Sequence, residues 1–544
     1  MDENGKFEQL VNDFLEDYFK RNPSYATFYG KKEYAKEIEQ GTQQHLEENV
    51  AKIKQLVQAL EELHLEALTF ENILTLEALK FWAKSDSFDL NDFPSWKKIP
   101  LGILEALATF IMLLQREGPS IELGEIMIAR LNKISGYLTE YETRFDGSPI
   151  PKIWKELALK QVKGVPSLFH FLETVFSEVG DLPKNLKTAL QQAIANVQPV
   201  IQAHIAWIEG LPEDQAAFAW ALGTEKFDKV LAERQLPWKR EAILQKGYDL
   251  LRSLKARAEQ IAKEIDPTKT YAEMIEALKV DHPPTFEMVL EHTRSEAERA
   301  KQFIQSHDLV TIPKDESLVI LETPEFLRPF VSVAGYWRAP YFDATMPGIF
   351  YMTPPPDEAG MKKFSYQEIT FYMVHEAYPG HHLDAVTNRA LPFPRVRALR
   401  DEISEGWAHY CEEMMLHQGF YDDPKKAELV IVNGQIWRAV RVIVDIELHC
   451  KQRTIEDAVK LLKEETYLDQ QTAEAQIHNY TLYPSGPLSY LIGKLLIEEL
   501  LQEVQTKLGE KFSYKFFHDT ILQGAGLPYP ILQKVFDYKI GQME

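Results

Sequence analysis

Apolar side chains recur every three to four residues along most of the first half of the chain. The pattern is clearest over residues 43–63, 184–211 and 238–265, and the stretches between such segments contain Pro, Gly and Asn. Apolar positions at this spacing form one face of an α-helix, and these residue types end helices. The pattern therefore predicts an almost entirely helical region up to about residue 265.

The pattern changes in the second half. Residues 318–321, 330–337 and 348–352 are rich in β-branched and aromatic side chains, which favour strands. We therefore predict a mainly α fold with a small sheet at about residues 318–352, followed by further helices. An edge strand of that sheet could align an extended peptide through its backbone, or the sheet could serve only to cover the core.

The length of the chain, 544 residues, exceeds the usual range of a single domain. A softer stretch with several prolines, residues 266–284, follows the helical region and is typical of a connection. We therefore predict two closely packed lobes, a helical lobe over residues 1–265 and a metal-binding lobe over residues 266–544.

Charge and cysteine content exclude several functions. The formal net charge is -22, which argues against nucleic acid as a partner because phosphate is bound by basic patches. Only two cysteines are present and neither belongs to a CxxC pair, so we expect no thiolate metal site and a cytoplasmic protein. We expect no secretory signal and no membrane span, because the apolar stretch at residues 100–114 is short.

The strongest chemical signal is the run HEAYPGHH at residues 375–382. Hydrolytic zinc sites use imidazoles and a carboxylate to hold the ion, and a separate carboxylate as general base. His375 is a predicted ligand, and Glu376 beside it is the predicted base. In a regular helix neither His381 nor His382 could share an ion with His375. Pro379 favours a local bulge or kink, so we expect His381 as the second ligand, with His382 as the alternative.

A third ligand is expected from the next helix, predicted over residues 401–416. Glu402, Glu405, His409 and Glu412 share one face of it. Glu405 is the predicted ligand because Gly406 and Trp407 follow it, and such neighbours suit a tightly packed helix. Glu402 and Glu412 could equally lie on a solvated face. His409 is expected to orient a ligand.

A further helix, predicted over residues 435–452, brings Arg438, Arg441, Asp445 and His449 near one face. Arg441 and Asp445 have the spacing of an intrahelical ion pair. Arg438 and Arg441 could instead bind a carboxylate of a peptide substrate. His449 could stabilise a developing oxyanion, or it could be a satisfied histidine of the core.

These runs also carry a resemblance to a family, which is specific in the second half of the chain and looser in the first. The segments are HEAYPGHH at 375–382, EGWAHY at 405–410, RAVRVIVD with LH at 438–449, and LSYLIGK at 488–494. With them the chain resembles the DUF885 family of bacterial proteins, which is itself similar to zinc metallopeptidases of the gluzincin type, including the carboxypeptidase Taq and oligopeptidase groups. The resemblance implies a large helical metallopeptidase-like fold.

The resemblance also implies site residues. Aligning Gly380-His381 with the Gly-His of the oligopeptidase motif HExGH supports His381, and it implies Glu405 as third ligand. Tyr483 and Tyr490 are implied as donors to the tetrahedral intermediate. The chain departs from the family at residues 484–487, where a Gly-Gln pair usually follows the proline, so its specificity could differ.

Together these features predict a hydrolase that binds one Zn²⁺ ion and acts on peptides as a carboxypeptidase or oligopeptidase. Two alternatives stay open: a catalytically inactive, metal-stabilised peptide-binding protein, and an amidase or esterase with non-peptide substrates. The sequence predicts neither the oligomeric state nor the choice between internal and terminal cleavage.

Overall fold

The computed structural model describes residues 2–328, 331, 333–398 and 401–543. Within them the fold is mainly α with two small sheets, as the sequence predicted. The chain divides into two compact units, residues 1–220 with 340–346, and residues 221–339 with 347–544. The predicted division at residue 265 was made on other grounds and stays a prediction.

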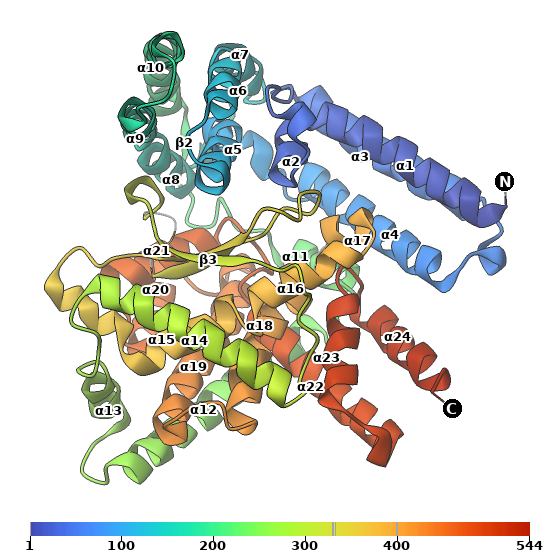
Figure 1. Cartoon of the computed structure of the whole chain (residues 1–544), viewed down its shortest axis with the longest axis vertical. Helices are drawn as coiled ribbons and strands as arrows, with labels where there is room; N and C mark the ends of the chain where they lie inside the picture. The colour runs from blue at the N-terminus through green and yellow to red at the C-terminus, as the bar shows by residue number, and fades with distance from the viewer. Residues whose placement is uncertain (1, 329–330, 332, 399–400, 544) are drawn as a thin grey trace. The chain divides into compact units, whose positions relative to one another are not determined.

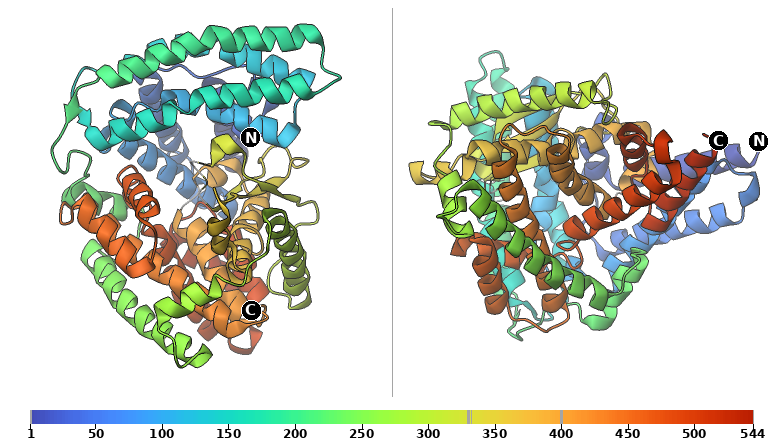
Figure 2. Two further views of the ribbon diagram at one scale, coloured as in Figure 1. Left: turned by 90° about the vertical axis from the view of Figure 1, so that its left-hand side faces the viewer. Right: turned by 90° about the horizontal axis from the view of Figure 1, so that it is seen from below.

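The first unit is almost entirely helical. Its helices are α1 (Glu3–Arg21), α2 (Pro23–Phe28), α3 (Gln43–Glu61), α4 (Phe70–Asn91), α5 (Gly102–Glu117), α6 (Ile121–Leu131), α7 (Ile134–Glu142), α8 (Lys152–Val162), α9 (Val165–Glu178) and α10 (Lys184–Gly210). The strands β1 (Ile150–Pro151) and β2 (Glu213–Asp214) form a short parallel pair. Figures 1 and 2 show α10 running beside α6 and α9.

Local chemistry accounts for these helices. The side chain of Thr42 accepts a hydrogen bond from the backbone of His45 and so caps the start of α3. Val50, Ile53 and Leu60 form the buried face of α3, and this is the apolar stripe that the sequence pattern predicted.

The second unit holds the remaining elements. Its helices are α11 (Thr224–Glu233), α12 (Arg240–Ile265), α13 (Tyr271–Leu278), α14 (Phe286–Ser306), α15 (Tyr366–Glu376), α16 (His381–Thr387), α17 (Phe393–Arg397), α18 (Asp401–His417), α19 (Pro424–His449), α20 (Ile455–Thr466), α21 (Gln470–Tyr480), α22 (Ser489–Leu508), α23 (Tyr514–Gln523) and α24 (Tyr529–Gly541). Helix α21 extends to Tyr480, so the turn that connects it to α22 covers residues 481–488.

The sheet of this unit has the strand order β3-β5-β4. Its strands are β3 (Leu318–Glu322), β4 (Ala334–Trp337) and β5 (Gly348–Met352). β5 pairs in parallel with β3 and antiparallel with β4, and all five of its residues are buried. The predicted strand at 330–337 begins later, at Ala334, and residues 330 and 332 lie outside the described residues. β3 and β4 are both edge strands.

Helix α19 is the centre of the second unit. It packs against α12, α15, α18, α20 and α22. From Leu429 to His449 every residue is buried except Asn433, Trp437 and Arg441, which are partly exposed. These three recur every fourth residue, so they form one stripe along the helix. A helix that is buried on its other sides belongs in a core, and this stripe is the side that solvent reaches.

Helices α18 and α22 cross at two glycines. A Cβ on Gly406 would stand 2.5 Å from the backbone of Gly493, and one on Gly493 would stand 1.9 Å from the carbonyl oxygen of Glu402. Backbone lies directly against backbone here, which confirms the tight packing that Gly406 and Trp407 predicted.

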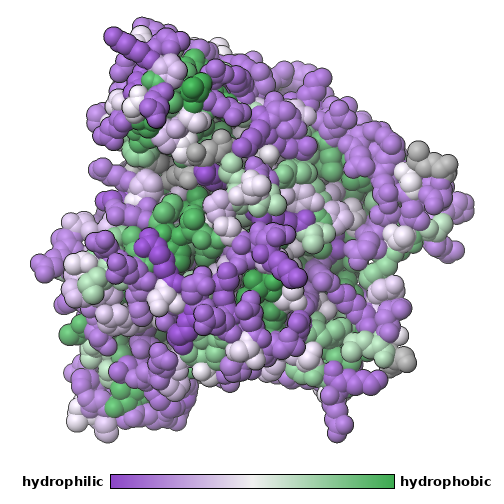
Figure 3. Space-filling model, viewed as in Figure 1, coloured by the Kyte–Doolittle hydropathy of each residue, from purple (hydrophilic) through white to green (hydrophobic). Residues whose placement is uncertain are grey.

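On the face shown in Figure 3, hydrophilic residues predominate and apolar residues gather in small patches. Within the described part of the chain, none of the helices combines the length and the apolar character that crossing a membrane requires.

The glycine crossing generates a prediction for stability. We expect Gly493→Ala to lower the free energy of unfolding by about 1–3 kcal/mol, because the added methyl group must push the two helices apart. Urea denaturation would measure the loss. Gly136→Ala in α7 is the matched control, since a Cβ there meets nothing within 4 Å and alanine favours a helix. Equal stability of the two variants would contradict the prediction.

Candidate metal centre

The run HEAYPGHH forms two helices instead of one kinked helix. α15 ends at Glu376 and α16 begins at His381, with residues 377–380 as a loop between them. We expected a local bulge at Pro379, and the structure shows a complete break. Gly380 sits so close to the end of α15 that a Cβ would stand 1.9 Å from the carbonyl oxygen of His375. The break brings His381 beside His375, with the two ring centres 4.8 Å apart.

A side chain of α18 supports this loop. The indole nitrogen of Trp407 donates to the carbonyl oxygen of Pro379 at 2.8 Å. Trp407 is fully buried and stands two residues after Glu405. The residue that supports the loop and the predicted third ligand therefore come from the same turn of one helix.

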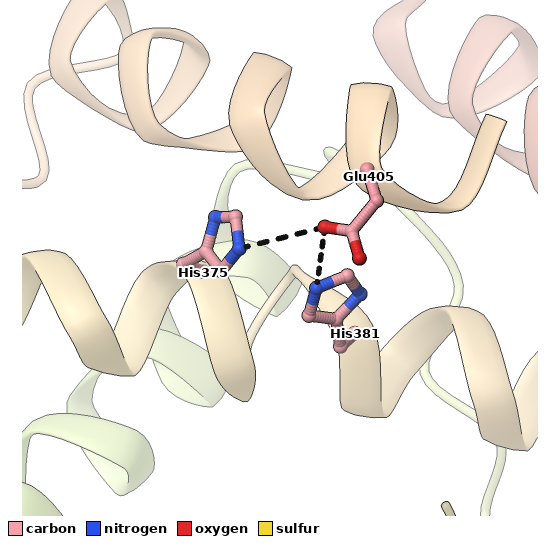
Figure 4. Close-up of side chains that lie close together, drawn as sticks. All are labelled: His375, His381 and Glu405. Atoms are coloured by element: carbon pink, nitrogen blue, oxygen red, sulfur yellow. Dashed lines mark ion pairs between the residues drawn. The ribbon is translucent and has the colours of Figure 1, made fainter. Parts of the chain in front are cut away.

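His375, His381 and Glu405 converge (Figure 4). One potential ligand atom from each lies within 4.8 Å of the other two. The Nε2 atoms of His375 and His381 lie 3.9 and 3.3 Å from the same oxygen, Oε2 of Glu405. That oxygen is buried and makes no hydrogen bond within the described part of the chain. Two imidazole nitrogens and an unsatisfied carboxylate oxygen are a donor set that fits zinc.

The charges of the group are strongly coupled. Burial disfavours the charged form of His381, but the carboxylates of Glu405 and Glu376 raise its pKa to about 9. Burial likewise disfavours ionised Glu405, yet His381 and His375 hold the pKa of this carboxyl at about 2. The Glu405 carboxylate is therefore ionised at neutral pH, as a metal ligand must be.

A buried carboxylate orients His375 from behind. Oε1 of Glu412 accepts from His375 Nδ1 at 2.7 Å, and Oε2 accepts from His409 Nδ1 at 2.9 Å. Because Nδ1 of His375 is the donor, its Nε2 presents a lone pair towards Glu405. Glu412 is fully buried, so the alternative of a solvated face for Glu402 and Glu412 was wrong. His409 contacts Glu412, in keeping with a supporting role.

Glu402 is buried as well, and its partner is an arginine that the sequence analysis missed. Arg234, which directly follows α11, donates from Nε to Oε1 of Glu402 at 3.0 Å, and its Nη2 lies 2.9 Å from Oε2. The same guanidinium donates to the hydroxyl groups of Ser485 and Ser489. Through the bidentate pair with Glu402 and the contacts with the serines, Arg234 connects the start of α18 to the turn before α22.

The two predicted substrate-binding arginines differ in what surrounds them. Arg438 lies with Nη2 3.3 Å from Glu412 and donates from Nη1 to the Gly434 carbonyl, so it neutralises the carboxylate behind His375. Arg441 belongs to the exposed stripe of α19. It donates to the hydroxyl group of Tyr480, and not to Asp445, whose carboxylate accepts from backbone N–H groups of residues 485 and 488. The expected Arg441–Asp445 ion pair was wrong.

Aromatic rings hold the guanidinium of Arg441. Its carbon lies 4.6 Å from the ring centre of Trp437 and 4.4 Å from that of Tyr490. Both distances are typical of cation–π contacts. Burial lowers the pKa of Arg441, but Tyr480, Tyr490 and the Glu405 carboxylate raise it, whereas burial and then Glu405 raise the pKa of Tyr490. Both side chains therefore lie within electrostatic reach of Glu405.

The other predicted site residues lie in different surroundings. His449 is buried, with Nε2 donating to the carbonyl oxygen of Tyr480 at 3.0 Å. Tyr483 is 56% exposed and its hydroxyl group donates to Asp401. His382 is buried and faces Glu316, with Nε2 and Oε2 2.8 Å apart. His382 is therefore not part of the three-residue group.

Part of the group is accessible to solvent. On α15, Glu368, Tyr372 and Glu376 are partly exposed and recur every fourth residue. His381, Glu405 and Tyr490 are also partly exposed, although most of their neighbours are buried. Glu376 is thus accessible beside the candidate ligand His375, as a general base must be.

The metal-ligand group generates a prediction for binding. We expect the protein to bind one Zn²⁺ per chain, and Glu405→Gln to weaken that binding by at least about 10-fold, because an anionic ligand becomes a neutral amide. Titration calorimetry would measure both. Glu413→Gln, which changes the neighbouring carboxylate on α18, one that pairs with Lys494, is the control. Unchanged zinc affinity of Glu405→Gln would contradict Glu405 as a ligand.

Comparisons with known proteins agree on the family and the fold. None of the curated proteins compared with the chain matches it significantly. The crystal structure of a proposed lipoprotein from Colwellia psychrerythraea is similar with a TM-score of 0.85 and 21% identity, covering 100% of both chains. The structure of a proposed lipoprotein of unknown function from Shewanella oneidensis is similar with a TM-score of 0.77 and 21% identity, covering 97% of this chain and 99% of the other. At this identity they show the fold alone. The family model described as "Bacterial protein of unknown function (DUF885)" matches residues 23–535, so the chain belongs to the DUF885 family.

Proposed function

We propose that the protein is a zinc-dependent hydrolase and, within that class, a metallopeptidase. The observation that carries the proposal is the convergence of His375, His381 and Glu405 on one point, with Glu376 next to His375 on the face that solvent reaches. Three ligands with an accessible side are the arrangement of a catalytic zinc site, whereas structural sites are closed by four protein ligands. The similarity to gluzincin-type peptidases at the sequence level points the same way.

In this proposal each residue has a separate task. His375, His381 and Glu405 hold the ion, and Glu412 keeps the Nε2 lone pair of His375 directed at it. When bound, zinc lowers the pKa of water towards neutrality and polarises a substrate carbonyl. Glu376 takes the proton from the attacking water and delivers it to the leaving amine. Glu376 holds no metal in this scheme, so it is free to move a proton.

Among the predicted donors to the oxyanion, the surroundings favour Tyr490. Its pKa is raised by burial and then by the Glu405 carboxylate, so its hydroxyl group keeps its proton at neutral pH and can donate. Tyr483 and His449 are engaged by Asp401 and by a backbone carbonyl, respectively. Their catalytic roles stay predictions.

Arg441 supports a peptide as the substrate. It is a guanidinium on the accessible stripe of α19, held by aromatic rings near the ligand group, and it makes no ion pair within 4 Å among the described residues. A cation placed in this way suits the terminal carboxylate of a peptide. We therefore propose a carboxypeptidase in preference to an oligopeptidase. The cytoplasmic location stays a prediction, and the two structural neighbours are described as proposed lipoproteins.

The general base can be tested on the zinc-loaded protein. We expect Glu376→Gln to keep zinc affinity within a few-fold of wild type and to lower kcat on a mixed peptide library by roughly 100-fold or more. Mass spectrometry over time would follow the products. Glu368→Gln, two turns earlier on the same face, is the matched control. Burial already raises the pKa of Glu368 to about 7, so glutamine resembles its protonated form.

The outcomes separate the alternatives. Peptides shortened from the C-terminus by wild type, and not by Glu376→Gln, are the expected result. If both proteins hold zinc and neither cleaves any peptide, the metallopeptidase proposal fails, and a peptide-binding protein or a hydrolase of other carbonyl substrates takes its place.

The role of Arg441 can be tested with matched substrates as the control. We expect Arg441→Gln to raise KM by roughly 10-fold or more for peptides with a free terminal carboxylate, because a charge-assisted hydrogen bond contributes about 1.5–3 kcal/mol. The same peptides with an amidated C-terminus lack that charge, so the substitution should leave their KM nearly unchanged. Steady-state kinetics on the two series would decide. An equal loss on both would show that Arg441 does not bind the carboxylate.

A further inference from the structure

The loop between α15 and α16 is held from two sides. Trp407 of α18 supports Pro379 on one side, as described above. On the other side stands Glu316, which lies two residues before β3 and far upstream of the metal motif. Its Oε2 accepts from the hydroxyl group of Tyr378 and from Nε2 of His382, the latter at 2.8 Å. One carboxylate oxygen therefore joins the residues on either side of Pro379-Gly380-His381.

The second oxygen of Glu316 is also engaged. Its Oε1 lies 2.6 Å from Nζ of Lys301, which belongs to α14. Helix α14 runs along β3 (Figure 1). The Lys301 ammonium also lies 5.3 Å from the ring centre of Tyr378. The carboxylate thus connects the metal loop to α14 and to the start of the sheet.

These contacts define the state of His382. Its Nε2–H donates to Glu316, and its Nδ1 accepts from the hydroxyl group of Tyr336 at 3.0 Å. Both nitrogens are used, which explains why His382 is held away from the ligand group while its neighbour His381 joins it.

The charge on Glu316 is maintained although the side chain is only 3% exposed. Burial disfavours the ionised form, but His382, Lys301 and Tyr378 together hold the pKa of this carboxyl at about 2. A buried carboxylate with three donors is satisfied, and removing its charge would leave Lys301 without its anion.

We propose that Glu316 is a positioning residue of the metal centre: through Tyr378 and His382 it fixes the loop that sets His381 opposite His375. The inference rests on the proposed function, because it assigns Glu316 a task only if these histidines hold an ion. His381 begins a helix and has no intrahelical hydrogen bond of its own at its backbone nitrogen. Its position therefore depends on the residues around it. Glu316 holds Tyr378, before the loop residues Pro379 and Gly380, and His382, directly after His381.

A role confined to general stability is the competing explanation, and the same surface offers a control. A cavity of about 520 Å³ is lined by α14, by β3 and by Glu316 and Tyr378. Glu298 also lines this cavity, but it is exposed and stands one turn before Lys301 on α14. Glu298→Gln therefore removes the same charge from the same cavity without touching the loop.

The test compares Glu316→Gln with Glu298→Gln and wild type. We expect Glu316→Gln to bind zinc 10–100-fold more weakly, the loss typical when a partner behind metal ligands is removed, and Glu298→Gln to bind like wild type. Competition with a chromogenic chelator would give the affinities. The visible absorption of the Co²⁺-loaded proteins reports the ligand geometry directly, and we expect its bands to shift only in Glu316→Gln. Melting temperatures would establish that each protein is folded at the assay temperature.

Each outcome has a distinct meaning. Wild-type zinc affinity and an unchanged Co²⁺ spectrum in folded Glu316→Gln would overturn the inference and leave the proposed function standing. If Glu316→Gln does not fold, Tyr378→Phe replaces it, because this change removes one donor and keeps the ring. It should weaken zinc binding by a few-fold, and wild-type affinity would again overturn the inference. A wild-type protein that binds neither ion would refute the proposed function itself, and the inference with it.

Discussion

Gly380 lies so close to the His375 carbonyl that no side chain fits between them. This contact fixes the start of α16 against the end of α15, and the geometry of the candidate ligand group depends on it. A regular helix would separate the two histidines along its axis. The break replaces the i and i+4 spacing of the common zinc helix with two helix ends that face each other, and Glu405 closes the group from a third helix.

The three helix segments are fixed by contacts of different kinds. Backbone packing at Gly406 and Gly493 sets α18 against α22, and the buried Arg234–Glu402 pair sets the start of α18. Buried charges of this sort are costly to desolvate and are stable only when fully paired. Around the candidate metal centre, pairing between buried charges therefore determines the orientation of side chains more than apolar packing does.

The sequence predicted the grouping of the candidate ligands better than their surroundings. Helical periodicity located α3, α10 and α18, and the residue types in HEAYPGHH singled out His375, Glu376 and His381. Periodicity shows which residues share a face but not what lies opposite that face. Glu412 could therefore not be distinguished from a solvated residue, and Arg441 appeared to face Asp445. Arg234 and Glu316 carry no local signal, because their partners are far away in the sequence. An arginine between helix-breaking residues and a carboxylate just before a strand are both common at surface positions. Neither sequence pattern therefore distinguishes a buried side chain from an exposed one.

Glu412 serves His375, His409 and Arg438 with a single carboxylate. Groups that share one partner do not contribute independently, so the effects of changing them are not additive. Replacing Arg438 alone leaves a buried negative charge, whereas replacing it together with Glu412 removes that cost and leaves His375 without an acceptor. We therefore expect the residues at positions 409, 412 and 438 to change together during evolution, so that these positions covary across relatives.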